Sequence, residues 1–172
     1  EDDAAATAID SVLASVAEQA PDAALFLIKA KEVDAAVDAD IESLRRVVDE
    51  VEVTDQLHLP IVAVVTHCDE LEPKNVRLHE PDDEDPQDIE EKLTRVRKAE
   101  SMLRRKLIDA GLKDRLVTVL GVSSYQSWRR DGTRRDDERW RIDMLLEYLL
   151  KELPNQARVE FARLSQIKNL QR

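Results

Sequence analysis

A run of apolar, mostly β-branched residues near the middle of the chain constrains its fold more than any other feature. It consists of Ile61-Val62-Ala63-Val64-Val65, with Pro60 before it and the polar sequence Thr66-His67-Cys68-Asp69 after it. An apolar run of this length, bounded by a proline and a polar cluster, is typical of a strand buried on both faces of a sheet. Ligands bind just beyond the carboxyl ends of such strands in open parallel sheets, so Asp69 is a candidate binding residue. The alternative interpretation is that Asp69 only caps the next segment.

Two similar apolar runs flank this one, at residues 23–28 and 116–122, and helical patterns separate the three runs. Apolar residues recur at helical spacing in residues 38–53 and 86–110, which predicts two amphipathic helices. A last helix is expected from about Asp136 to Pro154, and another helical pattern precedes the first run. This alternation of strands and helices predicts an α/β fold. The positions expected on the inner faces of the helices, or carried by the last helix, are Ile41, Leu44, Val48, Val51, Ile89, Leu93, Val96, Leu103, Leu107, Trp140, Ile142, Leu145, Leu146, Leu149 and Leu150.

The charge and cysteine content exclude several classes of function. A net charge of −11 over 172 residues argues against nucleic-acid binding across the whole surface. The sequence from Arg129 to Arg135 carries four arginines and is either a local basic patch or, as we favour, a solvated loop. Cys68 is the only cysteine, so no intramolecular disulfide forms; we interpret it as a small, half-buried filler rather than a catalytic thiol. No apolar stretch reaches the roughly 18 residues that a membrane-spanning helix needs.

Two short motifs at strand ends point to a known family. Thr66-His67-Cys68-Asp69 follows one predicted strand, and Ser123-Ser124-Tyr125 follows the next. Their order resembles the second half of a GTPase domain of the Era-like, translation-factor-related class, in which Asn/Thr-Lys-x-Asp follows one strand and Ser-Ala-Lys the next. The resemblance covers roughly residues 20–152. It implies a partial P-loop GTPase fold: a three-layer α/β sandwich with a mostly parallel sheet.

The resemblance also implies a guanine-binding site made by the two motifs. Guanine presents adjacent N–H donors at N1 and at the 2-amino group, and one carboxylate accepts both, which makes Asp69 the base-selecting residue. Thr66 takes the Asn position and ties neighbouring loops together. His67 replaces the usual Lys and stacks on the base or lies exposed. Ser123 and Ser124 place backbone N–H groups near guanine O6. Tyr125 replaces the second Lys, and it either stacks on the sugar or base or covers the core.

The phosphate-binding half of such a domain has no counterpart in this sequence. The chain has only three glycines and no G-x-x-x-x-G-K-[ST] motif, which would cradle the phosphates and Mg²⁺. We therefore expect one of three situations: that half lies upstream, it has been removed by proteolysis, or another chain covers the sheet edge that it would cover. Mg²⁺ is expected only in its presence, and we assign no catalytic or metal-binding residue here. The acidic sequence from Asp82 to Asp85 lacks the spacing of an EF-hand loop and is interpreted as a solvated loop. The parent protein, of the bacterial type, would bind GTP or GDP, hydrolyse GTP and act as a molecular switch.

Residues 1–153 are accordingly interpreted as the C-terminal part of a GTPase domain, and residues 154–172 as an amphipathic helix leading out of it. Residues 155–170 of that helix are expected to pack against the GTPase domain, a further C-terminal region or a second chain. The expected location is the cytoplasm, or the membrane periphery through regions outside this sequence. A competing hypothesis is a non-enzymatic interaction module on a degenerate GTPase scaffold, which the departures at His67 and Tyr125 favour. A third is a flavodoxin-like or receiver-like domain, for which Lys29-Ala30-Lys31 supplies no suitable loop.

Overall fold

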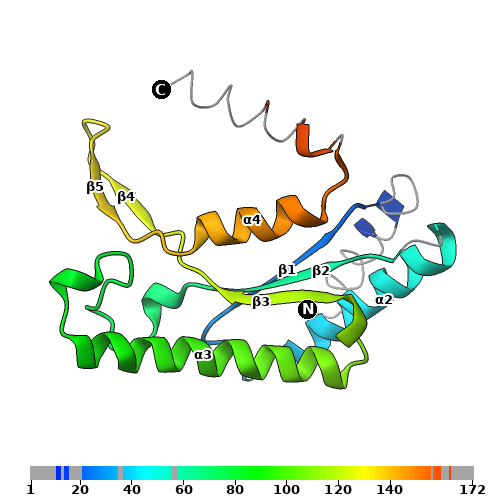
Figure 1. The fold of residues 1–172 in the computed structure, drawn as a ribbon, viewed down its shortest axis with the longest axis horizontal. Coiled ribbons are helices and arrows are strands. Elements are labelled where there is room, and N and C mark those ends of the chain that lie inside the picture. Colours follow the sequence, from blue (N-terminus) through cyan, green and yellow to red (C-terminus); the bar gives the residue numbers. More distant parts are fainter. Residues whose placement is uncertain are drawn as a thin grey trace.

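The computed structural model of the chain describes residues 11–12, 14–15, 21–34, 37–55, 58–155, 157–159 and 163. Its helices and strands are shown in Figure 1. In chain order they are β1 (Ala24–Lys29), α2 (Val37–Asp55), β2 (Ile61–Thr66), α3 (Pro86–Asp109), β3 (Leu116–Gly121), β4 (Gln126–Trp128), β5 (Arg134–Asp137) and α4 (Ile142–Glu152). Single 3-10 turns lie at Cys68–Glu70, Pro81–Asp83 and Lys113–Arg115.

The main sheet has three strands in the order β1-β2-β3, and both strand pairs are parallel. Ala24 pairs with Ile61 at one end of the sheet, and Val65 pairs with Gly121 at the other. The central strand is β2, whose residues Ile61–Val65 are all fully buried, as the unbroken apolar run predicts. The predicted α/β class with a parallel sheet is confirmed.

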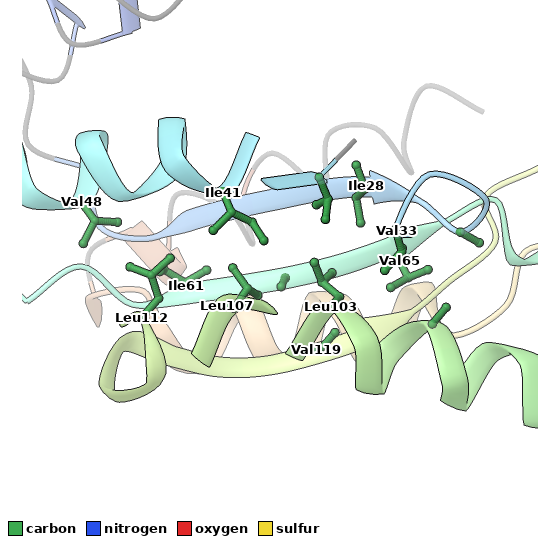
Figure 2. Close-up of a cluster of buried hydrophobic side chains, with 14 of the residues drawn as sticks. Ile28, Val33, Ile41, Val48, Ile61, Val65, Leu103, Leu107, Leu112 and Val119 are labelled. Carbon is green, nitrogen blue, oxygen red and sulfur yellow. The ribbon is translucent and has the colours of Figure 1, made fainter. Parts of the chain in front are cut away.

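The sheet lies between two layers of helices. Helices α2 and α3 cover one face, and α4 covers the other (Figure 1). Figure 2 shows the core under α2 and α3, where Ile41 and Leu103 meet the sheet residues Ile61, Val65 and Val119. On the other face, α4 packs on a smaller cluster built around Val62, Val64, Leu120 and Val122. Alternation along β2 therefore supplies both cores with apolar side chains.

The helical periodicity correctly predicts α2 and α3. All four inward positions named for α2 lie in the core or against it, as do Val96, Leu103 and Leu107 of α3. Ile89 and Leu93, also expected on the inner face, are half-buried and belong to neither core cluster. Asp85 caps the start of α3, where its side chain accepts a hydrogen bond from the Gln87 N–H at 2.8 Å. After α3 the chain turns through Gly111 at φ 84°, a left-handed conformation that favours glycine.

The region between β3 and α4 differs from the prediction. Instead of a charged loop and a helix from Asp136, β4 and β5 form an antiparallel hairpin, and α4 begins only at Ile142. Asp136 lies on β5, and Trp140 lies before the helix, where its N–H and C=O both bond to the backbone of Ser123. These two backbone bonds hold residue 140 in an extended pairing that a helix cannot contain. The prediction that Trp140 belongs to the last helix is therefore wrong.

Several other predictions have definite outcomes. Cys68 is fully buried, not half-buried. Arg134 and Arg135 lie on β5, paired with Asp137 and Asp136, so half of the predicted basic loop is strand. No helix in the described residues is long and apolar enough to cross a membrane. Most of the N-terminal helical pattern lies outside the described residues. The same holds for most of the predicted C-terminal amphipathic helix.

Candidate functional site

The two motif loops meet at the carboxyl edge of the parallel sheet. The Val122 N–H donates to the carbonyl of Val65 at 2.8 Å, and the Cys68 N–H donates back to the carbonyl of Val122 at 3.2 Å. On the other side of β2, the Ala30 N–H donates to the Thr66 carbonyl at 2.9 Å. Because parallel strands end at the same edge of a sheet, these backbone bonds bring three strand-end loops together.

The first loop begins with a strained turn at His67. Its backbone is left-handed (φ 58°, ψ 39°), a conformation that costs a residue with a Cβ about 1 kcal/mol or more. This turn places Cys68 in the core, where its thiol donates to the Val65 carbonyl, and places Asp69 at the surface edge. The Thr66 hydroxyl donates to the Ile28 carbonyl at 3.2 Å, which ties the end of β2 to β1. Since that bond uses its only proton, the 2.9 Å contact with His67 requires the ring to donate from Nδ1.

The second loop brings its first serine to Asp69. The Ser123 side chain is 2% exposed, and its hydroxyl donates to Asp69 Oδ1 at 2.7 Å. Asp69 itself is half-buried in the 3-10 turn. A carboxylate has about four lone-pair positions, so one bond from Ser123 fixes its orientation and leaves acceptor capacity for a ligand. Two residues 54 positions apart in the sequence therefore form one oriented acceptor group.

Ser124 and Tyr125 lie beyond this pair, on the surface. Ser124 is exposed, and the Tyr125 side chain is 48% exposed, so it does not cover the core. The Tyr125 carbonyl accepts a hydrogen bond from the Glu138 N–H, which places Tyr125 at the base of the hairpin. The structure thus forms two side-chain pairs at this edge, Thr66 with His67 and Ser123 with Asp69, and leaves Ser124 and Tyr125 at the border of the site.

Lys92 is a member of this site that the sequence analysis missed. Its side chain is fully buried, and its ammonium donates to three backbone carbonyls, those of Asp69 at 2.9 Å, Pro73 at 3.1 Å and Val76 at 2.8 Å. Burial lowers the pKa of this ammonium, although nearby carboxylates oppose the shift. A signal was present: position 92 lies three residues after Ile89 and four before Val96, within the apolar stripe of the helix.

Glu100 makes the corresponding link from α3 to the second loop. Its Oε1 accepts from the Gly121 N–H at 2.7 Å and from Arg141 Nη1 at 3.1 Å. The guanidinium of Arg141 also lies over the Trp140 ring, 4.0 Å from the centroid. Trp140 in turn bonds to the Ser123 backbone through its N–H at 2.9 Å and its C=O at 3.2 Å. The position of Ser123 therefore depends on a chain of contacts that starts on α3.

Three cavities open near this edge of the sheet. One, of about 390 Å³, has an apolar floor that includes Val33 and Met102 and a charged rim that includes Lys31 and Glu70. Lys31 and Glu70 form an ion pair at 2.8 Å, which lowers the pKa of the Glu70 carboxyl. Two others, of about 420 and 350 Å³, lie between residues 77–80 and the segment that includes Arg134 and Asp137. Both cavities are lined by basic and acidic side chains in similar numbers, so neither favours one sign of charge.

Among the residues that the structure describes, no group of three or more His, Cys, Asp or Glu side chains is arranged to hold a metal ion. Comparison of the chain with models of known protein families, with curated proteins and with solved structures finds no match in any of the three. The chemistry of the site therefore rests on its own geometry. That geometry is an oriented, half-exposed carboxylate at the carboxyl end of a buried parallel strand.

Proposed function

We propose that this chain carries the guanine-recognising part of a P-loop GTPase-type domain, with Asp69 as the residue that selects the base. The hydrogen bond from the buried Ser123 hydroxyl to Asp69 is the single observation that carries the proposal. It joins the two motifs that the sequence resemblance assigned to one binding site. The parallel order β1-β2-β3, with helices on both faces, supports the same family of folds.

The chemistry of the base explains why one oriented carboxylate suffices. N1–H and the 2-amino group of guanine lie side by side, and two carboxylate oxygens accept them in a bidentate pair. Adenine has an acceptor at N1 and no 2-amino group, so it cannot make this pair. Ser123 donates to one oxygen of Asp69 and stops the carboxylate from rotating freely. The Asp69 carboxylate therefore loses its orientational freedom when the chain folds and not when the base binds. Such preorganisation lowers the entropic cost of binding guanine.

The remaining motif residues have supporting roles in this proposal. Thr66 holds the loop to β1, and the exposed ring of His67 stacks on the base. The Ser123 N–H already donates to the Trp140 carbonyl at 3.2 Å, so the Ser124 N–H is the backbone donor proposed for guanine O6. Exposed Tyr125 contacts the sugar. GTP or GDP would be the ligand of the intact switch protein. The sequence has no Walker-type loop, so the proposal assigns no phosphate or Mg²⁺ contact, and no step of hydrolysis, to the described residues.

The proposal is tested by titrating the isotope-labelled chain with nucleoside monophosphates and following backbone amide signals by NMR. We expect GMP to shift signals of residues 66–69 and 123–125 with a dissociation constant of about 1 mM, near −4 kcal/mol. AMP should leave them unchanged, and IMP, which lacks the 2-amino group, should bind more weakly than GMP. Asp69→Asn should reverse the preference from GMP to XMP, whose 2-oxo group accepts from the Asn amide.

The control is Asp85→Asn, which changes a carboxylate at the α3 N-terminus without touching the site. It should leave the GMP response intact. Equal shifts with GMP and AMP, or a GMP response that Asp69→Asn does not alter, would overturn the assignment. The second part of the proposal is that the chain alone neither binds GTP tightly nor hydrolyses it, and measurable GTP turnover by the purified chain would contradict that.

A non-enzymatic interaction module is the second candidate function, and one observation favours it. Leu25 and Leu27 on β1 are 44% and 55% exposed, on a strand that lies at an edge of the sheet. Apolar side chains on an accessible sheet face are typical of a surface that contacts another protein. A chain that gives no response to any of the four monophosphates would favour this second function over the first.

A further inference from the structure

A fully buried lysine is costly unless its charge is satisfied, so the partners of Lys92 show what the residue is for. The ammonium has three protons, and three carbonyl oxygens accept them at 2.8–3.1 Å. All three carbonyls belong to the loop that leaves the Asp69 turn, residues 69–76. The contact fixes the backbone of Asp69 itself, because one of the three is the Asp69 carbonyl.

Glu100, on the same helix, fixes the other loop. Its carboxylate is bonded to the Gly121 N–H and to Arg141, whose neighbour Trp140 is paired to Ser123 through two backbone bonds. Lys92 and Glu100 are eight residues apart, about 12 Å along the axis of α3. A single rigid helix therefore sets where the donor Ser123 and the acceptor Asp69 lie with respect to each other.

We infer that Lys92 and Glu100 are positioning residues of the base-selecting site: through them helix α3 holds Asp69 and Ser123 at hydrogen-bonding distance and in the orientation that a guanine requires. The effect of these two residues on guanine binding rests on the proposed function, whereas their effect on the positions of Asp69 and Ser123 does not. A displacement of about 1 Å in a functional group can lower the activity of a site by as much as a hundredfold. Neither residue touches the ligand in this arrangement, so each acts only through the backbone of a loop.

The first test compares Lys92→Met with Lys98→Met in the full chain. Met keeps the length and volume of the buried stem but leaves three carbonyls without their donor. Lys98 lies on the exposed side of the same helix, so its substitution is the matched control. We expect Lys92→Met to move the NMR signals of the Asp69 carboxyl and the Ser123 amide, to weaken GMP binding about tenfold, and to reduce the preference for GMP over IMP. Lys98→Met should change none of these.

Chemical rescue separates positioning from general loss of stability. Lys92→Ala removes three carbons and a nitrogen, which are the atoms of n-propylammonium. We expect this cation to restore the wild-type signals of Asp69 and Ser123 in Lys92→Ala. The neutral 1-propanol, of the same size but with one donor, should restore them poorly. Equal rescue by both molecules would show that Lys92 only fills space, and would overturn its positioning role.

Glu100→Ala, with the exposed Glu90→Ala as control, tests the second half of the inference. It should move the signals of Gly121 and Ser123 more than those of residues 73–76, because Glu100 contacts the loop of Ser123 and not the loop that Lys92 holds. Unchanged Ser123 signals in folded Glu100→Ala would overturn the role of Glu100.

Two other negative results can be told apart from a failure of this inference: variants that do not fold, and a wild-type chain that does not bind GMP. If the Lys92 variants do not fold, the wild-type chain still gives a decision: the Lys92 ammonium should show through-hydrogen-bond couplings to the carbonyl carbons of residues 69, 73 and 76. Absence of those couplings, in an ammonium signal that is visible, would overturn the inference. If the wild-type chain does not bind GMP, the proposed function fails. The Asp69 and Ser123 signals of the variants still show whether α3 positions this pair of residues.

Discussion

Cys68 illustrates at the scale of one residue how burial sets chemistry. Its thiol is fully buried, and burial, together with the nearby Glu100 carboxylate, raises its pKa from 9.0 to about 12. A thiol that is protonated at neutral pH is a poor nucleophile, which agrees with a packing role. Its titration also predicts a pH dependence of stability. Below pH 9 the thiol is protonated in both states, and above it the unfolded chain loses its proton first.

We therefore expect the contribution of Cys68 to the free energy of unfolding to fall by about 1.4 kcal/mol per pH unit between pH 9 and pH 12. Urea unfolding at pH 8, 9 and 10 measures it, with Cys68→Ala as the comparison. The variant should be less stable at pH 8, because it leaves a small cavity, but its stability should decline less steeply. Lys92, whose pKa is lowered by burial, contributes a slope of the opposite sign in both proteins. Parallel pH profiles would contradict the buried-thiol assignment.

His67 gives a second prediction at this scale. Its left-handed backbone costs a residue with a Cβ about 1 kcal/mol relative to glycine. His67→Gly should therefore be more stable than His67→Ala by about 1 kcal/mol in urea unfolding, despite the greater flexibility of glycine in the unfolded chain. Both variants lose the same contact with Thr66, so their difference reports the backbone alone. An Ala variant as stable as the Gly variant would show that the turn is not strained.

The sequence allowed prediction of single residues only where a strand position fixed them. Asp69 and Ser123 each follow a buried parallel strand, and the shared sheet edge brings them together as expected. Lys92 could not be predicted in the same way. A lysine in a charged amphipathic helix normally extends to solvent, and its three acceptors come from a loop whose course the sequence does not specify.

At the scale of elements, α3 packs closely on β3 at Gly121. A Cβ built there would lie 2.6 Å from Val96 Cγ1 and 3.1 Å from both Cys68 Sγ and Glu100 Oε1. Gly121→Ala should therefore push α3 away from the strand and lower the free energy of unfolding by about 1–3 kcal/mol. The control is Gly111→Ala, where nothing lies within 4 Å and only the positive φ opposes the change. Chemical unfolding that gives Gly121→Ala the stability of wild type would show that helix and strand are not closely packed here.

Prediction of whole elements succeeded where the apolar pattern was long. The helices α2 and α3 follow from many residues at helical spacing, and β2 from an unbroken apolar run. The hairpin was missed because β4 and β5 have only three and four residues, and β5 consists of Arg134-Arg135-Asp136-Asp137. Charged strands carry no apolar alternation. What fixes this hairpin is a set of ion pairs and the Asp131-Gly132 turn, where Thr133 bonds to the Asp131 carboxylate.

At the scale of the whole molecule, the sheet is covered unequally. Strand β1 lies at one end of the order β1-β2-β3, and its outer edge pairs with no strand among the described residues. Its side chains alternate: Ile28 is buried under α2, whereas Leu25 and Leu27 are half-exposed on the opposite face. A free strand edge beside exposed leucines is a surface that favours association with another strand.

We therefore expect the purified chain to self-associate at high concentration through β1, and Leu27→Lys to reduce this association. A lysine on an edge strand disfavours strand pairing, and replacing a side chain that is already 55% exposed should cost little stability. Val53→Lys is the matched control, because Val53 is 80% exposed on α2 and the change adds the same charge away from the edge. Sedimentation velocity over a concentration series compares the three proteins, and thermal unfolding checks that they remain folded. If Val53→Lys reduces association as much as Leu27→Lys does, net charge rather than the β1 edge controls it, and the edge is not the contact surface.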